Sequence, residues 1–187
     1  MRTVTYGGAV SLDGFLAADD GAIDWLHFSK DVQQVMQDYW KGIDTILMGR
    51  KTYEVAVTQG RVSPKGSRKG QGRAKKSITR TYVFSHTLRS LDHPDAELVT
   101  GDAAEFVRDL KRRPGKAICL MGGGELAQSL LAADLVDQIG LNIHPILLGS
   151  GIPTFRDPAH RIHLTLTECR QLEGGCILAC YRVLHSE

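Results

Sequence analysis

The sequence predicts an α/β fold in which a mostly parallel central sheet is flanked by helices and closed by an antiparallel C-terminal hairpin. Up to residue 144, short apolar runs alternate with segments of helical periodicity, which is typical of a parallel sheet. Residues 162–172 and 176–184 then alternate around Gly174-Gly175, which indicates the hairpin. We find no internal repeat, so residues 1–187 are expected to form a single domain.

The first half of the chain predicts a strand at residues 2–12, expected to be central, and a glycine- and aspartate-rich loop at 13–21. Ser29 is placed to cap a helix, and a buried strand at 44–48 runs into a short helix that starts near Arg50. The helix after Ser29 carries apolar residues of one face at helical spacing: Val32, Val35, Met36, Tyr39 and Trp40.

The second half predicts further strands and helices in alternation. Strands are expected at residues 82–84, 97–99, 117–121 and 136–144. One helix is expected at about 102–112, ended by Pro114-Gly115, and another follows the glycines at 122–124.

Composition excludes several classes of protein. The 187 residues are 42% hydrophobic and 24% charged, with a net charge of +2, which predicts no polyanionic partner. No apolar run approaches the roughly 18 residues of a membrane helix, and the N-terminus lacks the features of a signal peptide. A cytoplasmic protein with no membrane partner is therefore expected.

The four cysteines show no C-x-x-C spacing, and no metal site is expected. If Gly174-Gly175 forms a two-residue turn, Cys169 and Cys180 lie directly opposite each other. A disulfide is nevertheless not expected, because cytosolic thiols stay reduced.

Residues 59–80 carry eight basic residues and no acid. A flexible, solvated loop at about 59–78 is one interpretation, and an electropositive arm that steers an anionic ligand is the other. The segment has no interleaved aromatic residues on which bases could stack, which argues against nucleic-acid binding.

The most informative stretch is residues 117–131, where an apolar strand leads through Gly122-Gly123-Gly124 into a helix. Free N–H groups at such a helix start attract an anion, and glycine lets it approach closely. The spacing satisfies G-x-G-x-x-A, but these glycines come late in the chain and no carboxylate lies about 20 residues on. A Rossmann domain is therefore excluded.

A second turn, at residues 48–52 (MGRKT), also follows a buried strand and opens a helix. Two such turns at neighbouring strand ends could hold the diphosphate of a dinucleotide between them. Arg50 and Lys51 would lie near an extra phosphate, which favours NADPH over NADH, although both could equally be plain surface residues. Thr52 could donate its hydroxyl or cap the helix.

Residues 48–54 (MGRKTYE), 83–85 (VFS) and 121–125 (MGGGE) resemble motifs of the dihydrofolate reductase-like superfamily in order and spacing. Residues 9–14 (AVSLDG) are similar to its branch that contains the riboflavin-biosynthesis reductase domain. The resemblance covers nearly the whole chain. It implies an α/β reductase that binds NADPH at strand C-terminal ends, delivers hydride to a C=N or C=O group, and forms a homodimer.

The resemblance also implies roles for residues of the cofactor site. The backbone of Ala9 would hold the nicotinamide carboxamide, with Leu16 beside the ring and Ser85 on the adenosine side. The diphosphate, 2′-phosphate and ribose contacts would come from the two glycine turns: Gly49, Arg50, Lys51, Thr52, Gly122, Gly123, Gly124, Glu125 and Leu126.

Two positions depart from the riboflavin branch. Its reductases carry a lysine where this chain has Gly7, and an acid where this chain has Met121. The loss of both groups argues against a phosphoribosyl substrate.

Candidate proton donors are Asp13 and Asp31, with Asp24 near the expected substrate site. Asp13 could equally be a turn former and Asp31 a first-turn helix acid. Trp25 is expected to stack on the substrate or to lie in the core, and Phe155, with the more structural His144, to close the far side.

The sequence thus predicts an NADPH-dependent reductase acting on a small heterocyclic or carbonyl substrate. One alternative is the riboflavin-pathway reductase that acts on 5-amino-6-(5-phosphoribosylamino)uracil. Another, of a different class, is a non-catalytic NADPH-binding sensor or scaffold.

Overall fold

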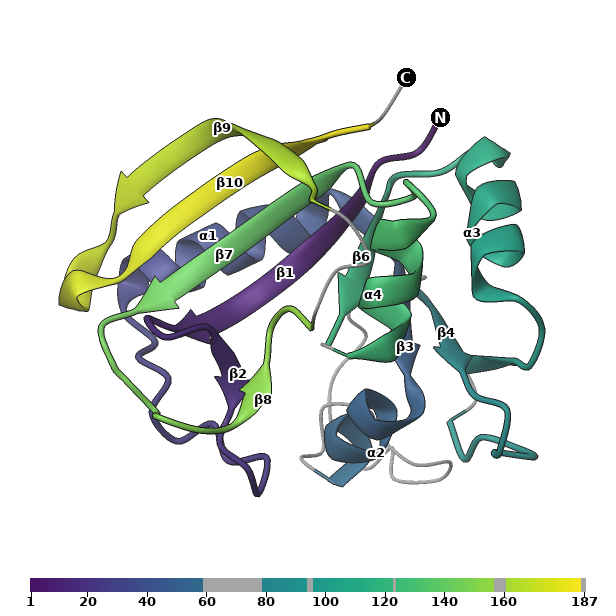
Figure 1. Cartoon of the computed structure of the whole chain (residues 1–187), viewed down its shortest axis with the longest axis horizontal. Helices are drawn as coiled ribbons and strands as arrows, with labels where there is room; N and C mark the ends of the chain where they lie inside the picture. The colour runs from purple at the N-terminus through teal and green to yellow at the C-terminus, as the bar shows by residue number, and fades with distance from the viewer. Residues whose placement is uncertain (59–78, 94–95, 123, 157–160, 186–187) are drawn as a thin grey trace, which may run out of the picture.

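The computed structural model describes residues 1–58, 79–93, 96–122, 124–156 and 161–185. Eight strands form one sheet in the order β5-β4-β3-β6-β1-β7-β10-β9, and two short strands, β2 and β8, pair beside it (Figure 1). The strands are β1 (Val4–Ser11), β2 (Phe15–Ala17), β3 (Ile43–Gly49), β4 (Arg80–Phe84), β5 (Ala96–Val99), β6 (Ala117–Met121), β7 (Gln138–His144), β8 (Ile152–Pro153), β9 (His163–Gln171) and β10 (Ile177–Leu184). The α-helices are α1 (Lys30–Lys41), α2 (Arg50–Thr58), α3 (Ala103–Arg112) and α4 (Glu125–Ala132).

The predicted fold class is confirmed. Pairing is parallel from β5 through β4, β3, β6 and β1 to β7, and β10 runs antiparallel to both β7 and β9. The first strand is central, as expected, because β1 pairs with β6 on one side and β7 on the other. The strands β2 and β8 were not predicted, because two- and three-residue strands carry no alternating pattern.

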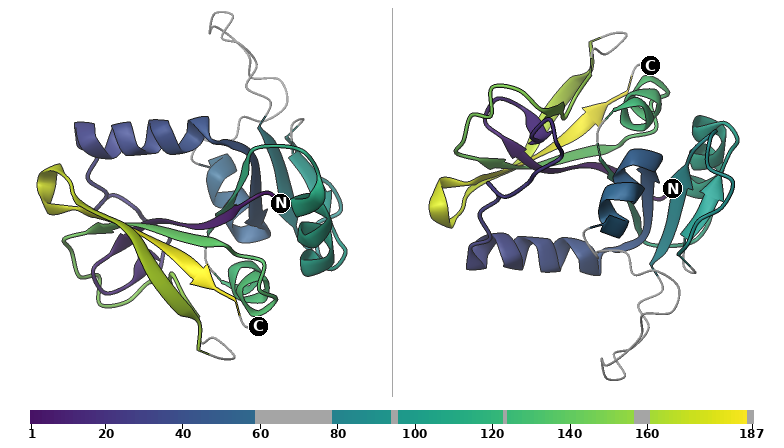
Figure 2. Two further views of the ribbon diagram at one scale, coloured as in Figure 1. Left: turned by 90° about the horizontal axis from the view of Figure 1, so that it is seen from above. Right: turned by 90° about the horizontal axis from the view of Figure 1, so that it is seen from below.

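The helices α3 and α4 cover one face of the sheet, and α1 lies on the other (Figure 2). The helix α2 joins α1 on its side, where Tyr53 packs against Met48 and Val83. Ser29 caps α1 as predicted, since its hydroxyl accepts a hydrogen bond from the N–H of Val32 at 3.2 Å.

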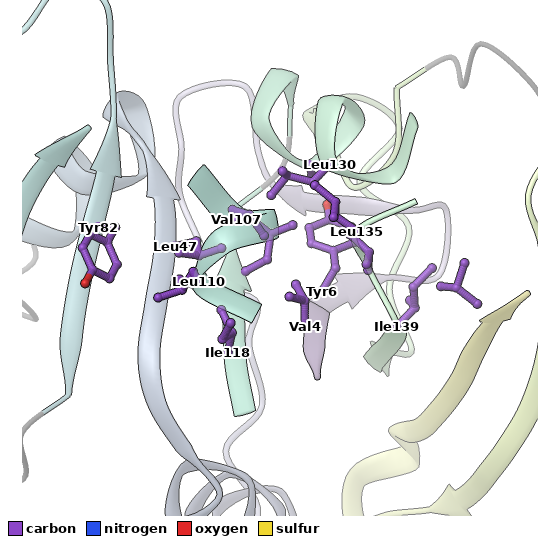
Figure 3. Packing of buried hydrophobic residues seen from close by; sticks show 14 of the residues in the cluster. Val4, Tyr6, Leu47, Tyr82, Val107, Leu110, Ile118, Leu130, Leu135 and Ile139 are labelled. Atoms are coloured by element: carbon purple, nitrogen blue, oxygen red, sulfur yellow. The ribbon is translucent and has the colours of Figure 1, made fainter. Parts of the chain in front are cut away.

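The main hydrophobic core fills the space between the sheet and the pair α3 and α4 (Figure 3). Tyr6 of β1, Leu47 of β3 and Leu130 of α4 are all 0% exposed. The Tyr6 hydroxyl donates to the carbonyl of Thr154, which satisfies the polar end of this buried side chain. This face of the sheet therefore carries the main core.

The opposite face is not closed in the same way. On α1 only Val32 is buried, while Met36 and Trp40 keep 42% and 36% of their surface exposed. The sheet opposite offers Gly7 and Gly140, which have no side chains to fill the gap. The apolar face that the sequence assigns to α1 is correct, but it lines a cleft instead of packing fully onto the sheet.

The expected juxtaposition of Cys169 and Cys180 is wrong. The hairpin loop has three residues, Glu173–Gly175, and Leu172 donates its N–H to the carbonyl of Cys176. The register therefore shifts by one residue, which places Cys169 opposite Ala179 and Cys180 opposite Glu168. All four cysteines are free thiols.

Among the described helices, none is long and apolar enough to cross a membrane. The basic segment at 59–78 lies outside the described residues, so both interpretations of it stay open.

Candidate active site

A large open cleft, of about 1770 Å³, runs between α1 and the sheet and reaches the C-terminal ends of β1, β3, β6 and β7. These four strands are parallel neighbours in the sheet. The carboxyl ends of parallel strands are the usual place for a ligand in an α/β fold. We refer to this feature as the cleft.

The two glycine turns meet at the cleft. Met48 of β3 pairs directly with Met121 of β6, so the chain turns at Gly49 and at Gly122 side by side. A Cβ at Gly122 would overlap the hydroxyl oxygen of Thr52, and the φ of Gly122 is 82°. Only glycine allows this close approach of one turn to the other.

Basic side chains accompany the first turn. Arg50 begins α2 and forms an ion pair with Glu54 one turn later, at 2.9 Å between Nη1 and Oε1. Lys51 is exposed and Thr52 is half-buried, and both line the cleft. The carboxylate of Glu54 neutralises part of the positive charge of Arg50 and Lys51 at the start of α2.

The second turn is completed by Gly124, which has a φ of 88° and precedes α4. A side chain not singled out from the sequence, Arg156, lies here, because its Nε is 3.9 Å from the position of a Cβ on Gly124. Arg156 also lines the cleft. No sequence motif points to it, because it comes from the segment after β8 and approaches α4 only in the fold.

Eleven of the twelve residues assigned to the cofactor line the cleft. The twelfth, Gly123, lies outside the described residues. The eleven are Ala9, Leu16, Gly49, Arg50, Lys51, Thr52, Ser85, Gly122, Gly124, Glu125 and Leu126. Ser85 has a further local role, since its hydroxyl accepts from the backbone N–H groups of Thr87 and Leu88.

The two candidate proton donors are held elsewhere, and neither is among the residues that line the cleft. Asp13 accepts hydrogen bonds from the Ser11 hydroxyl at 2.6 Å and from the N–H of Gly149 at 2.8 Å. The hydrogen bond from Ser11, followed by that from Gly149, holds the pKa of Asp13 below its ordinary value. Asp31 accepts from the N–H of Glu173 at 3.2 Å, which ties α1 to the C-terminal hairpin.

The three residues expected at the substrate also lie outside the lining of the cleft. Asp24 is exposed on its loop. Phe155 packs edge-on against Tyr6, with ring centroids 5.6 Å apart, and lines a separate apolar pocket of about 200 Å³ beside α4. Trp25 packs edge-on against His144, with centroids 5.4 Å apart, and so adjoins a residue that does line the cleft.

Asn142, which the sequence did not bring forward, and His144, to which it gave a structural role, both lie on β7 and line the cleft. His144 is only 2% exposed. Burial, followed by the nearby His27, holds the pKa of His144 below its ordinary value, so the ring is neutral. The alternation along β7 could have indicated them, because it places 138, 140, 142 and 144 on one face.

The residues present fit a dinucleotide. A Cβ at Gly49 would meet nothing within 4 Å, so the backbone at the first turn is open to a phosphate. Two helix starts and the guanidinium groups of Arg50 and Arg156 surround this part of the cleft. Among the described residues no group of three metal-binding side chains could hold a metal ion.

The fold and the two joined glycine turns define an α/β protein with a ligand cleft at the C-terminal ends of its parallel strands. A family model described as "RibD C-terminal domain" matches residues 2–178. The chain belongs to this family.

Two Bacillus subtilis proteins are similar along nearly their whole length. YyaP is 34% identical over 184 residues, which is 97% of this chain and 95% of YyaP. YwjB is 32% identical over 171 residues and 91% of each chain.

Solved structures share the fold at lower identity. A putative riboflavin biosynthesis protein from Shewanella sp. PV-4 superimposes with a TM-score of 0.80 at 22% identity, covering 99% of this chain and 100% of that one. A pyrimidine reductase-like protein from Corynebacterium diphtheriae gives 0.72 at 16% identity, covering 99% and 93%. A deaminase and 5-amino-6-(5-phosphoribosylamino)uracil reductase from Thermotoga maritima gives 0.70 at 16%, covering 98% of this chain but 57% of that one.

Proposed function

We propose that this chain is an NADPH-dependent reductase that delivers hydride to a C=N or C=O group of a small, flat heterocyclic or carbonyl compound. The observation that carries the proposal is the contact between Thr52 and Gly122, which joins two glycine turns that both line the cleft. Membership of the RibD C-terminal domain family supports the same class of activity.

In this proposal the two helix starts hold the diphosphate through backbone N–H groups, and Arg156 adds a cation beside Gly124. Arg50 and Lys51 bind the 2′-phosphate, which distinguishes NADPH from NADH. Ala9 and Leu16 also line the cleft, and in this proposal they contact the nicotinamide. When bound, the reduced nicotinamide supplies the hydride.

The shape of the cleft suits a flat substrate. Its floor includes Gly7 and Gly140, and the apolar side chains of Val32, Val35 and Met36 on α1 lie across from them. A planar ring would fit between the flat sheet surface at these glycines and the apolar face of α1, and it would exclude water from the two surfaces. The protein's contribution to such a reduction is orientation and a dry environment, together with a proton source for the receiving heteroatom.

The riboflavin-pathway reductase is the second candidate, favoured by the family and by the sequence at residues 9–14. The packing around Gly7, the position of the lysine in the riboflavin branch, argues against this candidate. A Cβ at Gly7 would overlap the carbonyl oxygen of Gly140 and lie 2.7 Å from its carbonyl carbon. No lysine can stand there in this backbone conformation. Turnover of the phosphoribosylaminouracil substrate with NADPH would decide in favour of this candidate.

A non-catalytic NADPH sensor is the third candidate, and the placement of Asp13 and Asp31 outside the cleft lining favours it. Tight NADPH binding with no oxidation across a panel of planar carbonyl and imine compounds would support the sensor over the reductase.

The first experiment is calorimetric titration of the folded protein with NADPH and with NADH. We expect NADPH to bind more tightly, because only NADPH carries the phosphate that Arg50 and Lys51 would contact. Absence of heat with both nucleotides would overturn the reductase and the sensor together.

We also propose that the protein forms a homodimer. The outer strand β9 exposes all nine of its residues, and Leu164 and Leu166 keep 41% and 53% of their surface exposed. Apolar side chains on an exposed edge strand favour association with a second chain. Sedimentation equilibrium tests this, and a monomer at all concentrations would contradict it.

A further inference from the structure

Several polar groups gather around His144, which lies at the C-terminal end of β7 and lines the cleft. They belong to three separate parts of the chain: the loop before α1, the strand β7, and the residue before β10. Their hydrogen bonds determine which way each group points.

The backbone N–H of His27 lies 3.3 Å from Nδ1 of His144. A backbone N–H can only donate, so Nδ1 must be the accepting nitrogen of the ring. The thiol of Cys176, 3.5 Å from the same nitrogen, can donate to it as well. The neutral ring of His144 therefore carries its proton on Nε2.

The side-chain amide of Asn142 is the partner of that Nε2–H, at 3.2 Å. An amide nitrogen and a protonated ring nitrogen are both donors and cannot bond to each other, so the Asn142 amide must present its oxygen to His144. The –NH₂ group then occupies the other amide position. That position is buried and has no hydrogen-bond partner among the described residues.

A second donor lacks a partner beside the same ring. The indole N–H of Trp25 is buried without a hydrogen-bond partner in the described chain, and Trp25 meets His144 edge-on at an interplanar angle of 86°. Of the two residues with unpaired donors, Asn142 lines the cleft, so an acceptor that enters the cleft can pair with its amide.

The sheet places this group next to the expected reaction centre. In the pairing of β1 with β7, Asn142 stands directly opposite Ala9, and both line the cleft. Ala9 is the residue assigned to the nicotinamide carboxamide. A substrate stacked on the nicotinamide would thus have its edge at Asn142.

We propose that Asn142, oriented by His144, donates hydrogen bonds to a carbonyl oxygen on the edge of the substrate ring. The substrate class is accordingly a planar lactam or cyclic amide, and a ring that presents an amino group at this edge is rejected. The inference rests on the proposed function for the identity of the stacked partner, and on the hydrogen bonds of His144 for the direction of the donors.

The test compares two probes of nearly equal shape, 2-pyridone and 2-aminopyridine, by NMR-detected titration of the protein with and without NADPH. The first presents a carbonyl oxygen and the second an amino group. We expect the native protein to prefer 2-pyridone by roughly 10-fold, the size of one hydrogen bond to a buried donor.

The variant Asn142→Asp replaces the –NH₂ group by an oxygen and keeps an acceptor for Nε2–H of His144. We expect it to reverse the preference in favour of 2-aminopyridine. The matched control is Gln138→Glu, the same amide-to-acid change on the same strand and in the same cleft. Gln138 accepts from the Thr5 hydroxyl, a bond that a carboxylate retains, so the control should keep the native preference.

A nitrogen NMR measurement of the ring tautomer is independent of any ligand, and it should find the proton on Nε2 of His144. A proton on Nδ1 overturns the inference. An equal affinity for both probes, as expected if the donors serve only a bound water molecule, also overturns it, as does an unchanged preference in Asn142→Asp. Failure to bind NADPH while the preference still reverses would overturn the proposed function and leave the recognition of the carbonyl standing.

Discussion

Gly122 and Thr52 lie so close together that a methyl group at position 122 would overlap the Thr52 hydroxyl oxygen and stand 3.0 Å from its Cβ and Cγ2. The contact joins the turn after β6 to the first turn of α2, two segments about 70 residues apart in the sequence. It follows from the pairing of β3 with β6, which brings both turns to the same end of the sheet.

Gly122→Ala should therefore damage both the fold and the cofactor site. The new methyl group would meet Thr52, and alanine would have to adopt a φ of 82°. We expect a loss of about 1–3 kcal/mol in the free energy of unfolding, measured by urea denaturation. NADPH binding should weaken in the same variant, because the two turns are pushed apart.

The matched control is Gly101→Ala, at a glycine where a Cβ would meet nothing within 4 Å. It should unfold at nearly the native urea concentration. The double variant Gly122→Ala with Thr52→Gly removes the clashing side chain and should recover part of the lost stability. Native stability and affinity in Gly122→Ala would show that the turns are not packed as described.

Arg50→Ala should separate the two pyridine nucleotides. Removing a charge-assisted contact to the 2′-phosphate costs about 1.5–3 kcal/mol, so NADPH affinity should fall roughly 10- to 100-fold, with little change for NADH. Isothermal titration measures both. Equal losses for the two nucleotides would contradict the placement of the 2′-phosphate.

The ion pair of Arg50 with Glu54 supplies the control. Glu54→Gln removes the carboxylate that competes for Arg50, so NADPH affinity should rise while NADH affinity stays the same. A fall in NADPH affinity would mean that Glu54 orients Arg50 for the phosphate instead of competing with it.

The sequence predicted the fold well because the signals that define it are local. The apolar runs gave the strands, Ser29 gave the start of α1, and the glycines at 122 and 124 gave the turn before α4. The hairpin register could not be obtained in the same way. Loops of two and three residues fit the same glycine pair, and only the hydrogen bond between Leu172 and Cys176 distinguishes them.

The substrate end of the site was less accessible to sequence reasoning. The expected cofactor site is formed largely by the backbone of two glycine turns, and such turns can be recognised in a sequence. The direction in which Asn142 points depends on His27 and His144, which lie over 100 residues apart and meet only in the fold. Aspartates are common candidates for proton donors in a sequence. In the fold, however, Asp13 and Asp31 accept hydrogen bonds from backbone N–H groups of distant loops.

Asp13→Asn tests the role of Asp13 as a loop anchor. Its pKa is lowered chiefly by the hydrogen bond from Ser11, so its contribution to stability is present above the ordinary value of 3.8 and is lost as the pH falls through the lower pKa of the folded state. The variant should melt at a lower temperature than the native protein at neutral pH. The difference should vanish in acid.

Hydrogen exchange gives the local measurement for the same variant. The amides of Leu148 and Gly149 bond to Asp13 and should exchange faster in Asp13→Asn. Asp24→Asn, a change at an exposed residue of the loop before α1, serves as the control and should leave both amides protected. Unchanged exchange in Asp13→Asn would contradict the role of Asp13 as a loop anchor and would leave it a candidate proton donor.

Stability below pH 6.5 should depend on His144. Burial and then His27 hold its pKa below the ordinary 6.5, so the folded ring stays neutral in mild acid while the unfolded chain takes up a proton. Its contribution is therefore complete above pH 6.5 and declines as the pH falls from 6.5 toward the lower pKa of the folded state.

Urea unfolding at about pH 7.5 and about pH 5.5 should show native stability falling in acid, since the histidine of the unfolded chain titrates between these values. His144→Gln should be less stable at both pH values but should lose less between them, because glutamine does not titrate. His163→Gln, at an exposed residue of β9, should retain the native pH dependence, and an identical slope in His144→Gln would show that the buried ring is not its source.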